Sequence, residues 1–233
     1  ATQSDDHLTN LLAAASQTKL ESFSAVIQRL RSNSDSSKSS TARRRLEKIG
    51  EASYSEVFKI FPPSKSTSTT QGEEQEAIVL KIIPVSSSTS SSSVDENQAN
   101  DLPYTSPSPD VTREIQLMQL ISHHSSSFVT LRTAYIVRGA YPSARLQAWD
   151  RWDARRRAKT GTGAENARPH VLAPQQVYAL LVMSDGGVDL ESLRVKTWLH
   201  AASILAQVVG GLAGMERACE FEHRDLHWGN VLV

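Results

Sequence analysis

The sequence has little of several features that mark specialised classes of protein. It contains one cysteine, Cys219, so it can form no disulfide within itself and no metal cluster built on cysteines. Its 25 basic and 25 acidic residues give a formal net charge of zero, so no global field attracts nucleic acid or an anionic membrane. We see no apolar run near the roughly 18 residues of a membrane span, and residues 1–10 are too polar for a signal peptide. These absences favour an intracellular protein whose charged sites are local.

Hydrophobic residues make up 39% of the 233 residues, enough for a packed core, and their spacing predicts a mixed α+β fold. Apolar residues at intervals of three and four predict amphipathic helices over 20–30, 111–121 and 198–215. Continuous or alternating apolar stretches predict strands over 46–61, 77–83, 128–137 and 177–183. Two segments rich in serine, 62–76 and 86–110, contain too few apolar residues to fold and are expected to be insertions in a sheet.

Residues 141–157 combine Leu146, Trp149 and Trp152 with five arginines. Arginines interleaved with tryptophans can contact nucleic acid, by ion pairing and stacking. A surface helix with its aromatics inward and its arginines in solvent explains the pattern more simply. We therefore expect no direct readout of nucleic acid by this segment.

The run His223-Arg224-Asp225 followed by Asn230, five positions after the aspartate, is typical of the catalytic loop of protein kinases. In that loop the aspartate accepts the proton of the substrate hydroxyl, and the asparagine holds Mg²⁺ on the phosphates. Asp225 is therefore predicted to be catalytic and Asn230 to be a metal ligand. The alternative is the surface-exposed end of a helix with no chemical role.

Lys81 interrupts an otherwise apolar predicted strand, and Glu114 lies on the following predicted helix. In a kinase the lysine bridges the α- and β-phosphates of ATP and the glutamate pairs with the lysine, so both are predicted to be catalytic. Taken alone, the two residues are as well explained by a lysine that reaches solvent and an exposed helical glutamate. The catalytic loop decides between these interpretations.

The segment 50–57 precedes the lysine strand, where a kinase has the hairpin that covers the phosphates. It has the first glycine of the expected pattern, Gly50, but Ala52 and Ser55 replace the other two. Both replacements raise the steric cost of a positive φ and are expected to limit closure of the loop. The remaining predicted contacts with ATP are a valine on each face of the adenine, a methionine at the back and backbone groups of a hinge: Val57, Val79, Met183, Ser184 and Gly186.

The catalytic loop and two other segments resemble the haspin family of protein kinases more than ordinary kinases. The matching segments are Phe221 to Leu232, which includes Trp228, then Gly186 to Glu191, and finally Arg138 to Pro142 followed by Ala148 to Asp150. The resemblance runs from about Arg45 to Val233. It implies a bilobal protein-kinase fold, with a small lobe built on an antiparallel sheet and a helical lobe. It also implies ATP and Mg²⁺ as cofactors, with Arg224 among the catalytic residues.

The same resemblance implies transfer of the ATP γ-phosphate to a threonine in a histone tail that begins Ala-Arg-Thr-Lys. Asp189 and Glu191 would then pair with the basic tail, and His227 would contact it beside Asp225. Acidic residues at the start of a helix are also common dipole partners, so this role stays open. A histone substrate implies a nuclear, chromosome-associated protein with chromatin as a further partner.

The sequence ends three residues after Asn230, before the second aspartate with which kinases hold Mg²⁺. We therefore expect a truncated kinase fold, with little activity in a polypeptide that ends there. The alternatives are a truncated pseudokinase that binds chromatin or proteins and, less favoured, a kinase of small molecules. The predicted organisation is a helical extension with a linker, a small lobe whose further insertion spans 141–174, a hinge and a partial helical lobe, over 1–40, 41–183, 184–187 and 188–233.

Overall fold

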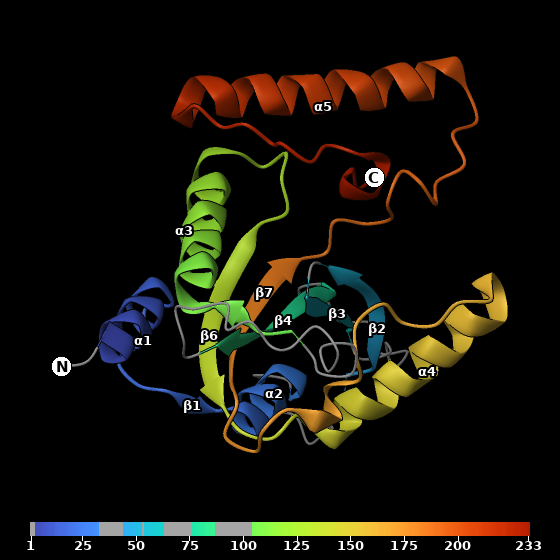
Figure 1. Cartoon of the computed structure of the whole chain (residues 1–233). Helices are drawn as coiled ribbons and strands as arrows, with labels where there is room; N and C mark the ends of the chain where they lie inside the picture. Colours follow the sequence, from blue (N-terminus) through green and yellow to red (C-terminus); the bar gives the residue numbers. More distant parts are fainter. Residues whose placement is uncertain (1–2, 33–43, 53, 63–75, 87–103) are drawn as a thin grey trace, which may run out of the picture.

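The computed structural model describes residues 3–32, 44–52, 54–62, 76–86 and 104–233. One mixed sheet forms the centre of the molecule (Figure 1). Its strands, in spatial order, are β1 (Glu21–Ser22), β6 (Leu131–Arg138), β7 (Val177–Ser184), β4 (Ile78–Ser86), β3 (Ser55–Ile60) and β2 (Leu46–Ala52), while β5 (Ser106–Pro107) pairs with β4. The short strands β1 and β5 pair in parallel with β6 and β4, and all other pairs are antiparallel. The predicted α+β kinase-like fold is confirmed.

Residues of β4 alternate between the two faces of the sheet, and each face has its own hydrophobic core. Leu80 and Ile82 belong to the core that includes side chains of α2 (Phe23–Arg31) and α4 (Ser143–Thr160). Val79 and Ile83 belong to the core that includes α1 (Gln3–Ala14) and α3 (Ser108–His124). Because side chains of a strand alternate with period two, Lys81 lies on the same face as α3. Lys81 therefore extends from the face of the sheet that α3 covers.

The amino-terminal region packs into the hydrophobic cores of the sheet, although it was predicted to be an extension. The predicted helix over 20–30 is found as α2, but α1 and β1 were not predicted. Leu11, in the last turn of α1, and Ala15, just after its end, are buried with Ile115 of α3. The segment 1–40 therefore contributes to both cores of the sheet, as far as its described residues show.

The second predicted insertion ends earlier than expected. Residues 106–110 were assigned to it, but they form β5 and the first turn of α3. Pro107 and Pro109 suit the start of a helix, because proline needs no hydrogen-bond partner there. Most of both serine-rich insertions, residues 63–75 and 87–103, lies outside the described residues.

Helix α4 confirms the predicted surface helix, with one correction. It packs against β2 and ends at Gly161, whose φ of 79° suits glycine at a helix terminus. Trp149 is buried as predicted, but Arg145 is fully buried as well, although all five arginines were expected in solvent. Arg145 shares the inward face of α4 with Ala148 and Trp149, and burial lowers its pKa to about 10.

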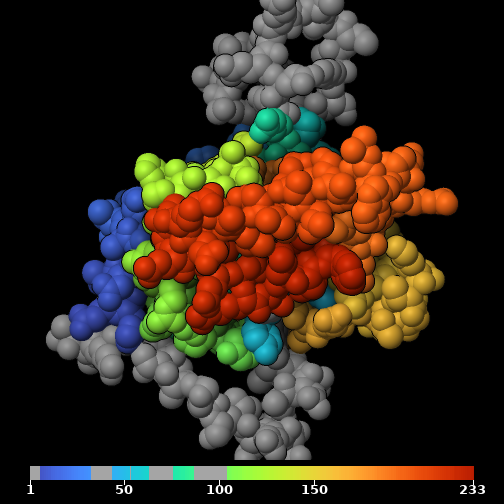
Figure 2. All heavy atoms as spheres, turned by 90° about the horizontal axis from the view of Figure 1, so that it is seen from above, coloured from blue at the N-terminus to red at the C-terminus, as the bar shows by residue number. Residues whose placement is uncertain are grey.

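Helix α5 (Trp198–Cys219) lies above one end of the sheet, and the chain returns beneath it to η3 (Trp228–Asn230) (Figures 1 and 2). Its first turn is capped by Thr197, whose hydroxyl oxygen accepts a hydrogen bond from the His200 N–H at 3.1 Å. By length and mean hydropathy of 1.3, α5 reaches the size of a membrane span, so our prediction that no segment does was wrong. This is weak evidence for a membrane, since helices of water-soluble domains pass the same test.

Candidate active site

Lys81 and Glu114 form an ion pair on the face of the sheet that α3 covers. Lys81 extends from β4 and Glu114 from the second turn of α3, and their Nζ and Oε1 atoms are 2.5 Å apart. The pair is half-buried rather than buried, with 19% of the lysine side chain and 33% of the glutamate side chain exposed. Both residues line a cavity of about 1320 Å³. The predicted pair is therefore present, and it is open to a ligand.

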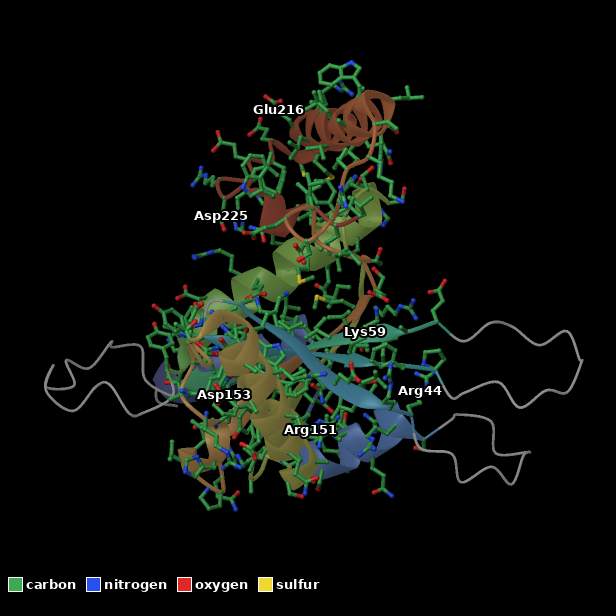
Figure 3. The ribbon with its side chains drawn as sticks, turned by 90° about the vertical axis from the view of Figure 1, so that its right-hand side faces the viewer. Arg44, Lys59, Arg151, Asp153, Glu216 and Asp225 are labelled. Atoms are coloured by element: carbon green, nitrogen blue, oxygen red, sulfur yellow. The ribbon has the colours of Figure 1, made fainter. Side chains whose placement is uncertain are left out.

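The opposite wall of the cavity comes from α5 and the segment after it, including His223 and Asn230. The Asn230 side-chain amide donates hydrogen bonds to the Asp225 carbonyl oxygen at 2.9 Å and to its carboxylate at 3.2 Å. Both bonds use the amide nitrogen, so the Asn230 side-chain oxygen remains available to a cation. Figure 3 shows Asp225 on this segment, between α5 and the sheet. The five-residue spacing thus brings the two predicted residues together.

The end of the catalytic loop is fixed beneath the hinge by backbone pairing. The N–H groups of Val188 and Leu190 donate to the carbonyl oxygens of Val233 and Val231, at 3.1 and 2.8 Å. The Val233 N–H returns a bond of 2.9 Å to Val188. This short ladder holds Asn230 at a fixed distance from the hinge.

The backbone pairing between the hinge and the last residues also explains the two glycines of the hinge. It brings Leu232 to the cavity, where the sequence analysis had predicted neither Leu232 nor Val129. A Cβ atom at Gly186 would lie 2.3 Å from Leu232 Cδ1, and one at Gly187 would lie 2.5 Å from the Val233 carbonyl oxygen. Gly187 also has a φ of 92°, in the region that favours glycine. Leu232 and Val129 line the cavity beside Gly186 and form its apolar part near the hinge. No pattern other than the position of Leu232 two residues after the motif pointed to them.

The predicted ATP-binding residues divide into two groups. Ser184 and Gly186 line the cavity together with Lys81. The Ser184 N–H donates to the Thr130 carbonyl oxygen at 2.9 Å, so it is already used within the sheet. The others lie outside the lining of this cavity, and their contacts with ATP stay predictions: Gly50, Ala52, Ser55, Val57, Val79 and Met183.

Within that second group, Val57 pairs directly with Lys81 across β3 and β4, so the two share the face toward α3. Val79 and Met183 are buried in the core on that face. Ala52 and Ser55 do not adopt positive φ, contrary to the strain that we expected there; Tyr54 does, with a φ of 62°. The residue of this hairpin that bears the steric cost of a positive φ is therefore Tyr54, which the sequence analysis did not single out.

Arg224 does not reach the cavity. Its guanidinium pairs with the Glu222 carboxylate at 2.8 Å, and 82% of its side chain is exposed. Its φ of 60° places it in the left-handed region, which turns the chain just before Asp225. The geometry gives Arg224 a part in the shape of the loop, whereas its predicted catalytic role stays a prediction.

The three predicted substrate residues have different surroundings. The Asp189 carboxylate accepts a 2.7 Å hydrogen bond from the Ser192 N–H, which holds the pKa of Asp189 below its usual value. Asp189 thus caps a turn. The Glu191 carboxylate lies beside Gly229 of the catalytic loop, 3.7 Å from where a Cβ would stand. His227 accepts a bond from the Gly229 N–H, and its Nε2 is 4.0 Å from the Asp225 carboxylate.

Comparisons with known proteins were made with the whole sequence. A family model described as "Haspin like kinase domain" matches residues 2–233. The chain is 36% identical over 124 residues to "Serine/threonine-protein kinase haspin homolog hrk1" of Schizosaccharomyces pombe, covering 53% of this chain and 24% of that protein. It is 31% identical over 192 residues to "Serine/threonine-protein kinase haspin" of Mus musculus, covering 81% of this chain and 23% of that protein. The matches thus span about a quarter of the length of these relatives.

Proposed function

Because the chain belongs to the family of haspin-like kinase domains, we propose that it binds ATP with Mg²⁺ in the cavity and transfers the γ-phosphate to a protein hydroxyl. One observation carries the proposal. Lys81 and Glu114, from the sheet and α3, line the same cavity as Asn230, which lies near the end of the sequence and holds Asp225 by a hydrogen bond. A volume of about 1320 Å³ is ample for a nucleotide and the end of a peptide.

The residues of the two walls fit this cofactor. Lys81 offers a cation for the phosphates, and Glu114 keeps it aimed into the cavity. Asn230 offers its side-chain oxygen as a metal ligand, and Mg²⁺ prefers oxygen ligands. The described residues contain no cluster of three metal-binding side chains, as suits an ion that takes its other ligands from phosphates and water. When bound, ATP would supply the phosphoryl group, and Mg²⁺ would neutralise the negative charge of the phosphates.

Asp225 is the proposed acceptor of the proton from the attacking hydroxyl. Its carboxylate is exposed and is oriented by the Asn230 amide at 3.2 Å. An aspartate held in this way can orient the hydroxyl and take its proton as the bond to phosphorus forms. The bond between the γ-phosphorus and the bridging oxygen breaks, and ADP leaves with that oxygen.

We propose a threonine near the start of a basic histone tail as the phosphate acceptor. Asp225 and Glu191 place negative charge along the catalytic loop, where a peptide with arginine and lysine next to its threonine would gain charge-assisted hydrogen bonds. The curated relatives are named serine/threonine-protein kinases. A nuclear, chromosome-associated location follows from this substrate and is part of the same proposal.

The experiment is transfer of labelled γ-phosphate from ATP to a peptide that begins Ala-Arg-Thr-Lys, by the protein expressed from its complete coding sequence. We expect transfer by the natural protein and a loss of about a hundredfold or more in Asp225→Asn, because general base catalysis typically contributes that much. The control is Glu216→Gln, an exposed carboxylate on α5, which should leave the rate unchanged. A peptide with alanine in place of threonine should accept no label.

Equal rates in natural and Asp225→Asn protein would contradict the proposed mechanism. Binding of the peptide without transfer by the natural protein would instead favour the alternative of a pseudokinase that serves as a binding module.

A further inference from the structure

The hairpin formed by β2 and β3 is held from the side of the sheet opposite to the cavity. Lys48 of β2 is 1% exposed, and its ammonium contacts carboxylates of both strands, Glu51 Oε1 at 3.0 Å and Glu56 Oε2 at 2.5 Å. The same ammonium lies 3.8 Å from the centre of the Trp152 ring of α4. We call Lys48, Glu51, Glu56 and Trp152 the hairpin anchor.

A β-bulge brings the charges of the hairpin anchor together. Lys48 pairs with Phe58, Gly50 pairs with Val57, and the register shifts between these two pairs. Because one extra residue reverses the alternation of side chains, Glu51 lies on the same face as Lys48. Gly50 then falls on the cavity face with Val57, and a Cβ on it would have no neighbour within 4 Å among the described residues.

The hairpin anchor contains two carboxylates, Glu51 and Glu56, and one ammonium group, Lys48, that contacts both. Glu51 and Glu56 are directly paired across the hairpin, so their carboxylates would repel each other without the lysine. Burial raises the pKa of Glu56 above its usual value, while the nearby Lys48 ammonium opposes that rise. Lys48 is thus the cation that lets two partly desolvated carboxylates sit on adjacent strands.

The loop after α4 ties this arrangement to the helix. The Glu165 N–H donates to Glu51 Oε2 at 2.9 Å, and the Asn166 amide donates to the Ser55 carbonyl oxygen at 3.1 Å. Arg156 adds a longer contact of 3.6 Å with Glu51. Figure 3 shows α4 alongside β2. The Ala164 N–H of this loop donates to Asp153 Oδ1 of α4 at 2.6 Å.

The turn of the hairpin is also restrained. The Ser55 hydroxyl, fully buried, donates to the Ala52 carbonyl oxygen at 2.7 Å and closes the turn. The Tyr54 ring lies on that of Tyr104, which is two residues before β5, with 3.8 Å between their centres. A hairpin with these contacts has little of the freedom that three glycines would give it.

We propose that Lys48 is a positioning residue for the phosphotransfer reaction, because the hairpin anchor fixes the β2–β3 turn over the nucleotide phosphates. The inference rests on the proposed function, and it names how ATP is held without the second and third glycines. Lys48 acts through the backbone of the hairpin, since it lies on the face away from Lys81 and cannot touch ATP.

The test is steady-state phosphorylation of the Ala-Arg-Thr-Lys peptide by Lys48→Met in the complete protein. We expect the KM for ATP to rise about tenfold, the equivalent of one hydrogen bond to a charged group, with the KM for peptide unchanged. Lys19→Met is the matched control, because this exposed lysine precedes β1 and is far from the hairpin in the chain. It should leave both constants unchanged.

A second variant tests the positioning role in case Lys48→Met does not fold. Asn166→Ala removes the amide bond to Ser55 and a longer one of 3.5 Å to Glu56 but keeps the buried ion pairs, so it should fold even if Lys48→Met does not. We expect its KM for ATP to rise about threefold, as for the loss of one neutral hydrogen bond.

An unchanged KM for ATP in folded Asn166→Ala and Lys48→Met, or an equal rise in the KM for peptide, would overturn the positioning role. That outcome leaves the proposed function intact as long as transfer still depends on Asp225, so the two failures are distinguishable.

Discussion

At the scale of single residues, Asp189 and Glu191 show how neighbours in sequence can have different roles. Asp189 accepts a hydrogen bond from the Ser192 backbone and pairs through its own backbone with Leu232. Glu191 lies beside the catalytic loop and has no such backbone bond among the described residues. A basic substrate can therefore reach Glu191 at less cost than Asp189, whose carboxylate is already used.

This contrast predicts that Glu191→Lys weakens the basic peptide and spares the nucleotide. The reversed charge would repel the arginine and lysine next to the threonine, so we expect the KM for peptide to rise about tenfold or more. The KM for ATP should not change, because Glu191 does not line the wall with Lys81. The measurement is the pair of KM values in the complete protein.

The control for this prediction is Glu220→Lys, which changes the same charge at an exposed position just after α5. An equal rise of the peptide KM in Glu220→Lys would mean that net charge alone matters. No change in Glu191→Lys would remove Glu191 from the substrate site.

At the scale of elements, the sequence predicted those with strong apolar patterns and missed those whose structure depends on neighbours. The strands β3, β4, β6 and β7 and the helices α2, α3 and α5 follow from their periodicity. The strands β1 and β5 have two residues each, too few for an alternation to be visible. Helix α1 is rich in polar residues and is recognisable only where Leu11 and Ala15 meet α3.

The same distinction applies to the site. The motif spacing predicted that Asp225 and Asn230 meet, and the strand and helix predicted that Lys81 meets Glu114. Lys48 was not singled out, because a lysine in an edge strand of a predicted hairpin usually points to solvent. Its burial depends on a one-residue bulge and on packing against α4, which no local pattern reveals.

Because α1 belongs to the core, Leu11→Ala should destabilise the domain. Leu11 is fully buried against α3, and loss of a buried leucine side chain costs about 2–4 kcal/mol. Asn10→Ala, an exposed position on the same helix, should change stability by less than about 0.5 kcal/mol. Denaturant-induced unfolding monitored by tryptophan fluorescence measures both.

If Leu11→Ala and Asn10→Ala had the same small effect, α1 would be a peripheral extension, as the sequence alone suggested.

At the scale of the whole molecule, two walls of different origin enclose one cavity. The sheet and α3 supply Lys81 and its carboxylate partner Glu114, and α5 with the returning chain supplies the wall that includes Asn230. The ladder between the hinge and the last residues joins the walls. Figure 2 shows the returning segment lying along α5, so this wall is formed by consecutive parts of the chain.

The central claim is that this cavity holds ATP with Mg²⁺. The most direct test is the affinity of the complete protein for ATP, measured by titration calorimetry with Mg²⁺ and with a chelator. We predict binding that weakens when Mg²⁺ is removed and that weakens about tenfold to a hundredfold in Lys81→Met, as for the loss of charged hydrogen bonds. No binding of ATP, or binding that neither Mg²⁺ nor Lys81→Met affects, would contradict the account.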